Sequence, residues 1–376
     1  MNEDKKYMRM ALRLAAFGVG QVEPNPAVGC VLVRDGKVIG KGYHKKFGEA
    51  HAEINALTDC RVRGEDPAGA TMYVTLEPCC HHGKTGPCTD AILEARIAKV
   101  FVAMSDPAEH ANGRGIRQLR GAGLDVEVGL CEHYARLLNA AYIKYARTHR
   151  PYVIVKWAQS LDGKLAWKPD SGPRWISGPL SRRDAHRLRR ASQAILTGVN
   201  TILDDDPLLT PRPPKGKSPL RVILDSQLRI LLRRKVMNTR RFGSLLFTTE
   251  TGVVGQDKKI DRILSKGVDV TVVPEVQGRC GLKTVLTELA RREVQQVLVE
   301  GGPTLITAFL EEGLADAVRI YIAPILLGDQ GHKPLSDAMA ALTRPTTLTD
   351  PEIKTFGHDV CISGEIDYSK SEASPR

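Results

Sequence analysis

The sequence has few aromatic residues and no long apolar segment. Aromatic side chains make up only 5% of the 376 residues, and the 42% that are hydrophobic are mainly aliphatic, a composition that suits α/β domains. No segment approaches the roughly 18 apolar residues that cross a bilayer, so we expect no membrane partner. The charged, amphipathic start also lacks the apolar block of a secretory signal, so we expect a cytoplasmic protein.

The cysteines and charges exclude two further classes of protein. Eight cysteines in a long chain without an export signal argue against a disulfide framework. Five of them are scattered, and we expect them to be small core residues: Cys30, Cys60, Cys131, Cys280 and Cys361. The net charge of +11 is spread over the chain rather than concentrated in a stripe, so we expect no nucleic-acid partner. Small phosphorylated ligands or a solvated surface explain this charge.

The chain length and one proline predict two domains. A chain of 376 residues is long for one hydrophobic core and sufficient for two. A helix predicted over 132–147 runs toward Arg150-Pro151, where proline disfavours helical geometry in the residue before it. We therefore place one domain at 1–147 and another at 151–368, followed by a polar tail at 369–376 that we expect to be disordered. Helix and strand patterns alternate in both domains, which indicates sheets covered by helices.

A cluster of metal-binding residue types lies in the first domain. His51-Ala52-Glu53 is followed by Glu77-Pro78-Cys79 and then by Cys88. One imidazole and two thiolates bind zinc and leave a fourth position for water, whose pKa zinc lowers to roughly 7. We assign Cys79 rather than its neighbour Cys80 because Cys79 follows Glu-Pro. Two simpler explanations stay open: a closed structural zinc site with His81 or His82 as the fourth ligand, and a coincidental cluster.

The loop between the two cysteines resembles that of one enzyme family. Zinc deaminases in general have two residues between these cysteines, whereas here eight residues separate them, in PCCHHGKTGPC. This loop is similar to that of the bifunctional deaminase/reductase family of riboflavin biosynthesis. Other segments agree with the family in order: PNPAVGCVLV, GYH, GEAHAEINAL, YVTLEPC, VKWAQSLDGK, RWIS, AILTGVNTILDDDPLLTPR, RVILDS, VEGGPTL and YIAPILLG. The resemblance therefore covers nearly the whole chain.

The resemblance implies a fold and two reactions. It implies an N-terminal cytidine-deaminase-like three-layer α/β domain and a C-terminal dihydrofolate-reductase-like α/β domain. The first domain would hydrolytically deaminate a diamino-ribosylaminopyrimidinone phosphate, with one zinc ion and with Glu53 moving protons. The second would use NADPH to reduce the ribosyl group to ribityl, giving an aminoribitylaminouracil phosphate. The family also favours a homo-oligomer.

The resemblance assigns substrate-binding residues in the first domain. Asn25 and His44 match residues that line the pyrimidine pocket, and His81 and Lys84 match the loop that meets the ribose phosphate. Asp106 matches a substrate contact after the strand KVFVAM. Ordinary hairpin and turn roles stay open for Asn25 and His44, and a solvated loop position stays open for Lys84.

The segment after Asp106 departs from the family pattern. The family usually reads D-P-N-P there, whereas this chain reads DPAEHANGRG, with Ala108 in place of the expected asparagine. We expect one hydrogen bond to the substrate to be absent or supplied elsewhere.

The second domain has no dinucleotide-binding fingerprint. No G-x-G-x-x-G occurs, which argues against a Rossmann site. The segment VLVEGGPTLITAFL instead predicts a strand, Gly301-Gly302-Pro303 and a helix. The glycines allow a ligand to approach the backbone, and the helix start offers free N–H groups to an anion. A plain strand-to-helix turn is the alternative.

The resemblance assigns the two sides of the reductase site. The NADPH side comprises Ala158, Trp175, Thr201, Asp205, Ser226 and a 302–308 loop that includes Gly302, Pro303 and Thr304. The substrate side comprises Arg189, Leu209, Arg212 and Glu300. Two arginines suit a phosphate, because a guanidinium binds its oxygens with paired hydrogen bonds.

Proton transfer in the reductase site has two candidate residues. Lys156 and Asp205 are the candidates, and a solvated acidic turn is the alternative for the run Asp204–Asp206. Pro173 stands where the family offers a small hydroxyl residue near the substrate. Two rival functions stay open for the whole chain: a transfer-RNA deaminase with an accessory domain, and a non-catalytic protein with a structural zinc.

Overall fold

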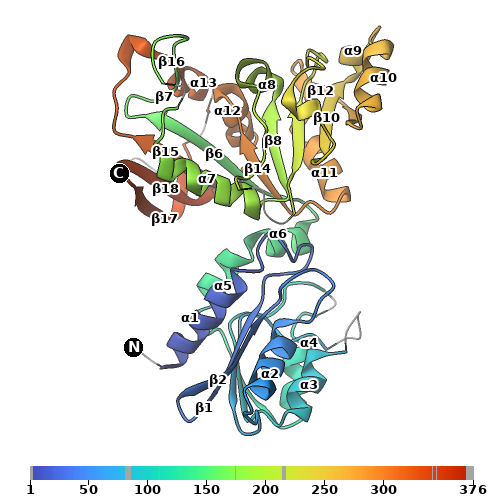
Figure 1. The fold of residues 1–376 in the computed structure, drawn as a ribbon, viewed down its shortest axis with the longest axis vertical. Coiled ribbons are helices and arrows are strands. Elements are labelled where there is room, and N and C mark those ends of the chain that lie inside the picture. Colours follow the sequence, from blue (N-terminus) through green and yellow to red (C-terminus); the bar gives the residue numbers. More distant parts are fainter. Residues whose placement is uncertain are drawn as a thin grey trace. The chain divides into compact units, whose positions relative to one another are not determined.

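The computed structural model describes residues 3–80, 86–109, 111–173, 175–213, 217–340, 342–343 and 345–369. The chain divides into two compact units, Met1–Arg150 and Pro151–Arg376, each with its own sheet (Figure 1). His81, His82, Lys84 and the predicted tail beyond Ser369 lie outside the described residues. Among the described helices, none has the length and apolar character needed to cross a membrane.

The first unit is a five-stranded sheet between two helical layers (Figure 1). The strand order is β2-β1-β3-β4-β5, in which β3, β4 and β5 are parallel and β1 is antiparallel to both of its neighbours. The strands are β1 (Gly29–Arg34), β2 (Lys37–Tyr43), β3 (Thr71–Val74), β4 (Lys99–Val102) and β5 (Asp125–Val128). The helices are α1 (Glu3–Ala15), α2 (Ala52–Val62), α3 (Cys88–Glu94), α4 (Arg114–Gly121), α5 (Glu132–Leu138) and α6 (Ala140–Thr148).

Both faces of this sheet are buried at its centre because successive side chains of the central strands are apolar. In β1, Cys30 and Leu32 pack with α2, α3 and α4, whereas Val31 and Val33 pack with α1 and α5. Side chains alternate between the two faces of a strand, so a continuous apolar run supplies two cores. This sandwich holds the loops at the ends of β3 and β4 in place.

The helix predicted over 132–147 is interrupted at Asn139, which is a correction to the sequence-based prediction. Asn139 has φ −107° and ψ 21° and joins α5 to α6. Its buried side chain accepts a hydrogen bond from the backbone N–H of Ala27 at 2.9 Å and donates one to the Ala27 carbonyl at 3.0 Å. The periodicity of the sequence could not show this break, because Ala27, the hydrogen-bond partner of Asn139, lies far away in the sequence.

The second unit is built on a nine-stranded sheet of order β11-β10-β9-β8-β14-β6-β15-β18-β17. The strands from β11 to β15 are parallel, and β18 and β17 add an antiparallel edge. The sheet strands are β6 (Tyr152–Ser160), β8 (Ala194–Gly198), β9 (Leu220–Leu224), β10 (Ser244–Thr249), β11 (Asp269–Val273), β14 (Gln296–Glu300), β15 (Ala317–Ala323), β17 (Thr347–Phe356) and β18 (Asp359–Asp367). Two small ribbons pair β7 (Lys164–Trp167) with β16 (Gly331–Pro334) and β12 (Glu275–Val276) with β13 (Arg279–Cys280).

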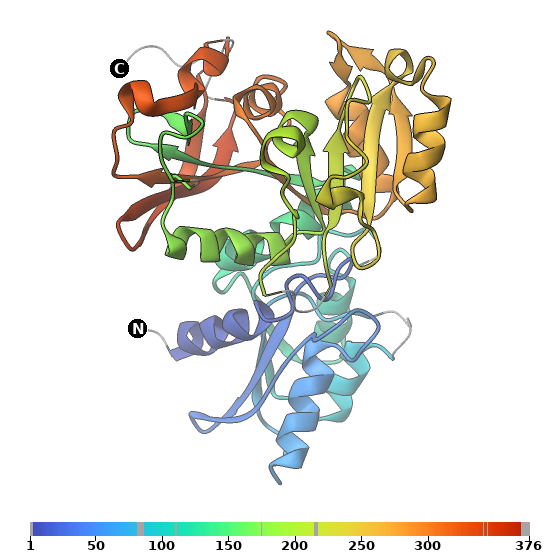
Figure 2. The same cartoon turned by 45° about the horizontal axis from the view of Figure 1, so that its top comes forward.

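Helices cover both faces of the central strands (Figures 1 and 2). In β14, Val297 and Val299 pack with α11 and α12, whereas Leu298 packs with the cluster of α8 and α10. The helices are α7 (Pro179–Ala191), α8 (Val199–Asp205), α9 (Glu250–Val253), α10 (Asp257–Ser265), α11 (Leu282–Arg291), α12 (Pro303–Glu311) and α13 (Leu335–Met339). Because β8 and β14 are parallel neighbours, the start of α8 and the start of α12 lie at the same edge of the sheet.

Candidate active sites

Three metal-binding side chains meet at the starts of two helices in the first unit. His51 caps the N-terminus of α2, Cys88 is the first residue of α3, and Cys79 lies in the loop after β3. The Nδ1 atom of His51 is 3.4 Å from Sγ of Cys79 and 3.3 Å from Sγ of Cys88. The three ligand atoms lie within 4.8 Å of one another. This imidazole–dithiolate set fits a tetrahedral zinc ion and leaves one coordination position open among the described residues.

The surroundings of this cluster suit Cys79 for binding a metal and Glu53 for transferring a proton. Hydrogen bonds from Cys88 and His51 lower the pKa of the Cys79 thiol, which metal binding requires as thiolate. Glu53 is 3% exposed, and burial together with the nearby Cys79 raises the pKa of its carboxyl to about 7. A carboxyl that titrates near neutral pH is suited to accept and release a proton.

Asn25 and His44 form a connected pair beside the metal cluster. The Nδ1–H of His44 donates to the carbonyl of Ala50 at 3.1 Å, which leaves Nε2 to accept from Nδ2 of Asn25 at 3.1 Å. Burial lowers the pKa of His44, which favours the neutral imidazole. The His44 ring lies 5.4 Å from the ring of His51. The structure therefore brings both predicted pocket residues to the metal cluster.

Asp106 is buried within the loop after β4. Its Oδ1 accepts hydrogen bonds from the Tyr142 hydroxyl and from the backbone N–H of Ala108, both at 2.9 Å. Ala108 contributes through its backbone alone at this position, so the departure from the family pattern does not remove the contact that orients Asp106.

Glu77 is a residue for which the sequence suggested no role. Its side chain is 5% exposed. It accepts hydrogen bonds from the backbone N–H groups of Asp106 at 3.0 Å, Gly113 at 2.9 Å and Gly115 at 2.9 Å. The only signal in the sequence is a carboxylate placed directly after a buried strand, which by itself does not identify its partners.

A cavity of about 850 Å³ lies within the second unit. Ten of the residues predicted for the reductase site line it: Lys156, Ala158, Trp175, Arg189, Thr201, Asp205, Leu209, Arg212, Glu300 and Gly302. Ser226, Pro303 and Thr304 are not among its described lining residues. Pro303 nevertheless opens α12 directly after Gly302, whereas Ser226 bonds to Cys280.

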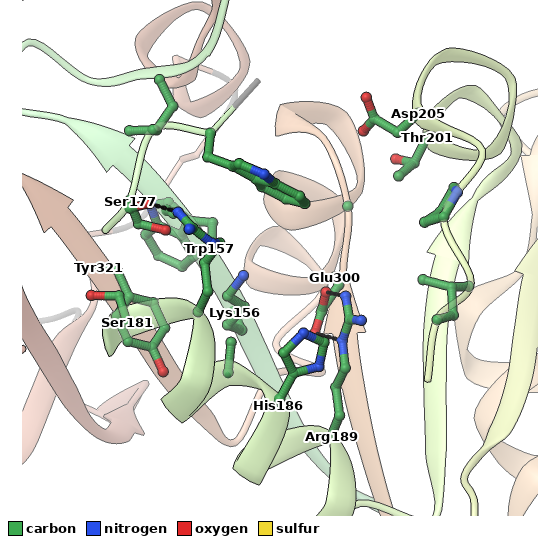
Figure 3. Close-up of a pocket in the computed structure, with 18 of the residues that line it drawn as sticks. Lys156, Trp157, Ser177, Ser181, His186, Arg189, Thr201, Asp205, Glu300 and Tyr321 are labelled. Atoms are coloured by element: carbon green, nitrogen blue, oxygen red, sulfur yellow. Dashed lines mark hydrogen bonds and ion pairs between the residues drawn. The ribbon is translucent and has the colours of Figure 1, made fainter. Parts of the chain in front are cut away.

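The floor of the cavity carries a buried ion pair (Figure 3). Arg189 donates through Nε and Nη2 to the two oxygens of Glu300 at 2.8 and 2.6 Å, and through Nη1 to the Thr210 carbonyl at 3.2 Å. Burial alone would raise the pKa of Glu300, but Arg189 and Lys156 lower it to about 2. Arg189 is therefore engaged by Glu300, whereas Arg212, the other arginine suited to a phosphate, is exposed at the cavity edge.

The two candidates for proton transfer, Lys156 and Asp205, lie on different sides of the reductase cavity. Lys156 on β6 points into the cavity, and burial lowers the pKa of its ammonium. Asp205 lies across the cavity beside Thr201 (Figure 3). The acidic run is not a separate turn, because Asp204 and Asp205 end α8 and Asp206 follows with a left-handed φ of 42°.

Two further cavity residues were missed by the sequence-based predictions. The guanidinium of Arg182 lies 5.4 Å from the Trp175 ring centroid, and its Nη1 donates to the Ser177 carbonyl at 2.6 Å. His186, one turn before Arg189 on α7, has a pKa lowered to about 4 by burial and by the charges of Arg189 and Arg212. A charged helix face hides both roles in the sequence.

Comparisons with known proteins agree with this two-site structure. Residues 151–362 match the RibD C-terminal domain family, and residues 1–104 match the cytidine and deoxycytidylate deaminase zinc-binding region. The riboflavin biosynthesis protein RibD of Aquifex aeolicus is 45% identical, covering 96% of this chain and 97% of its own. RibD of Escherichia coli is 39% identical, covering 96% and 98% of the two chains.

Solved structures give the same result. Acinetobacter baumannii RibD aligns with a TM-score of 0.81 at 34% identity, covering 97% of this chain and 99% of that one. A deaminase/reductase from Thermotoga maritima aligns with a TM-score of 0.82 at 33% identity, covering 96% and 98%. The expected fold class, a cytidine-deaminase-like domain followed by a reductase domain, is confirmed. The chain belongs to the RibD family and is a bifunctional deaminase and reductase of riboflavin biosynthesis.

Proposed function

We propose that the first unit deaminates a diamino-ribosylaminopyrimidinone phosphate and that the second unit reduces the ribosyl group of the product to ribityl. The Thermotoga maritima relative is described as a diaminohydroxyphosphoribosylaminopyrimidine deaminase and a 5-amino-6-(5-phosphoribosylamino)uracil reductase. The observation that carries the proposal is the His51–Cys79–Cys88 cluster beside buried Glu53. A transfer-RNA deaminase would not need the reductase-type residues 151–362.

In the deamination, His51, Cys79 and Cys88 would hold one zinc ion per chain. Bound zinc supplies a Lewis acid that makes water a nucleophile at neutral pH. Glu53 would take a proton from the attacking water and give one to the leaving amino group, so that a carbon–oxygen bond forms, the carbon–nitrogen bond breaks and ammonia departs. Asn25 and His44, which are joined by a hydrogen bond, would line the pyrimidine pocket, and Asp106 would bind the substrate from the loop after β4.

In the reduction, the second cavity would bind NADPH together with the deaminated product. The cofactor supplies the reducing equivalents. Gly302 and the N-terminus of α12 suit one of its phosphates, because the first N–H groups of a helix are free to bind an anion. Lys156 is our candidate for delivering a proton as the sugar ring opens, and Asp205 is the second candidate. Arg212 and the Arg189–Glu300 pair would bind the substrate side.

Three broader statements belong to the same proposal. We propose that the protein acts in the cytoplasm and forms a homo-oligomer. Its partners would be small phosphorylated pyrimidines rather than nucleic acids or membranes, since the positive charge is spread along the chain.

The test replaces Glu53 by glutamine in the full chain. Glu53→Gln keeps the side-chain shape but removes the proton-carrying group, so we expect ammonia release to fall by at least about 100-fold, within the range that general acid–base groups supply. Reduction of the separately supplied deaminated intermediate by NADPH should be unchanged. Glu49→Gln, which changes a carboxylate in the preceding loop, is the control and should keep both activities. Full ammonia release by Glu53→Gln would refute the proposed role.

A further inference from the structure

Glu77 joins two loops of the deaminase site that are distant in the sequence. Its backbone N–H donates to the Met104 carbonyl at 3.0 Å. Its Oε2 accepts from the N–H groups of Asp106 and Gly113, and its Oε1 accepts from that of Gly115. One buried carboxylate thus ties the loop after β3, which leads into Cys79, to the segment from Asp106 to the start of α4.

The junction between the loop after β3 and the start of α4 is also close-packed at Gly115. A Cβ at Gly115 would collide with the carbonyl oxygen of Pro78. Glycine is therefore required at 115 for the first turn of α4 to approach the cysteine loop. Since Pro78 lies between Glu77 and Cys79, the hydrogen bonds and the close approach act on the same few residues.

We propose that Glu77 is a positioning residue that sets the affinity of the deaminase site for its pyrimidine substrate through Asp106. Asp106 is held from both ends: its backbone N–H donates to Glu77, and its Oδ1 accepts from the Tyr142 hydroxyl and the Ala108 N–H. Glu77 itself is 5% exposed, and both of its carboxylate oxygens accept hydrogen bonds from backbone N–H groups, so it would act through the loop it holds. The inference rests on the proposed role of Asp106 in substrate binding.

The experiment uses the full chain with Glu77→Gln. The amide keeps the shape, but it offers one acceptor oxygen and turns its NH₂ group against backbone N–H donors, which leaves buried donors unsatisfied. We expect the KM for the diaminopyrimidine phosphate to rise about tenfold or more, with kcat within about threefold, because Glu53 and the metal ligands are unmoved. Zinc content should stay at the wild-type value, and amide hydrogen exchange should speed up at Asp106, Gly113 and Gly115.

A second variant and a control complete the test. Gly115→Ala perturbs the same junction without removing a charge, so it should reproduce the KM rise and the faster exchange. Gln118→Ala, on the exposed side of α4 where it bonds to Asp90, should match the wild type.

Two results would overturn the inference: unchanged KM and unchanged exchange in Glu77→Gln, or a loss of zinc, which would assign Glu77 to the metal loop instead. A wild-type protein that fails to deaminate this substrate would refute the proposed function, while the exchange rates would still decide whether Glu77 holds the segment.

Discussion

Arg189 and Glu300 form a bidentate ion pair at the floor of the reductase cavity. The two hydrogen bonds are 2.8 and 2.6 Å long, and the side chains are 18% and 12% exposed. Arg189 comes from α7 and Glu300 from the end of β14. A fork of two parallel bonds fixes the orientation of both groups, so the pair sets the position of the Glu300 carboxylate relative to Lys156.

Replacing Glu300 by glutamine should lower the free energy of unfolding of the second unit by an amount that depends on pH. The pKa of Glu300 is about 2 in the folded protein against an ordinary value of 4.5. A lowered pKa stabilises the folded state above pH 4.5 and ceases to do so as the pH falls toward 2. We expect Glu300→Gln to lower the free energy of unfolding of the second unit by about 3 kcal/mol at pH 7, because Arg189 is left buried without its partner. Urea unfolding of both proteins at several pH values measures the difference.

The matched control for this variant is Glu288→Gln. Glu288 pairs with Arg291 and Arg292, whose side chains are 75% and 35% exposed, so this change should alter stability by less than about 1 kcal/mol at any pH. A difference between wild type and Glu300→Gln that stays constant from pH 7 to pH 2 would contradict the assigned pKa.

Removing the metal should separate the two activities. Treatment of the full chain with a strong chelator should abolish ammonia release. Without the ion held by His51, Cys79 and Cys88, the site cannot activate water. NADPH oxidation with the deaminated substrate should continue at the wild-type rate, and added zinc should restore the first activity. Parallel loss of both activities on chelation would show that the metal serves the second unit as well.

Asn139→Ala should lower the stability of the first unit by removing its contact with Ala27. The side chain makes two buried hydrogen bonds to Ala27, two residues from Asn25. Their loss leaves a buried N–H and carbonyl unsatisfied, so we expect the free energy of unfolding to fall by about 1–3 kcal/mol. The KM of deamination should also rise as Asn25 shifts. Thermal unfolding and steady-state kinetics measure the two effects.

Thr148→Ala on α6 is the comparison for this variant. Thr148 makes an exposed hydrogen bond within its own helix, to the Lys144 carbonyl. Neither the free energy of unfolding nor the KM of deamination should therefore change appreciably. Equal losses in the two variants would assign the effect of Asn139 to the helix rather than to the Ala27 contact.

Arg182→Gln should loosen the cavity wall that carries Trp175. The variant loses a cation–π contact and a hydrogen bond to Ser177, each contributing on the order of 1 kcal/mol. We expect the KM for NADPH to rise about tenfold while kcat stays within about threefold, and the fluorescence of Trp175 to change. Arg187→Gln, an exposed position on the same helix, should leave both unchanged. An unaltered KM for NADPH would remove Trp175 from the cofactor side.

Local patterns in the sequence were enough for most of the elements and for the residue types of the first site. The pair Asp35-Gly36 between two apolar runs is typical of a tight hairpin, and these residues have the left-handed φ values of 51° and 72° that such turns require. The helix predicted to follow Gly301-Gly302 begins at Pro303 in the structure. Strands β17 and β18 were not predicted, because the largely exposed side chains of β17 lack a clear apolar alternation.

What only the tertiary structure decided is which distant groups share a contact. The spacing of His51, Cys79 and Cys88 suggested a metal, but their convergence depends on two helix starts meeting beside one strand end. The groups that donate to the Glu77 carboxylate lie 29 or more residues away, Ala27 lies 112 residues from Asn139, and Glu300 lies 111 residues from Arg189. No local propensity encodes such pairs. Composition and periodicity describe how a segment buries its own side chains, whereas a buried hydrogen bond is satisfied only by whichever segment the fold brings beside it.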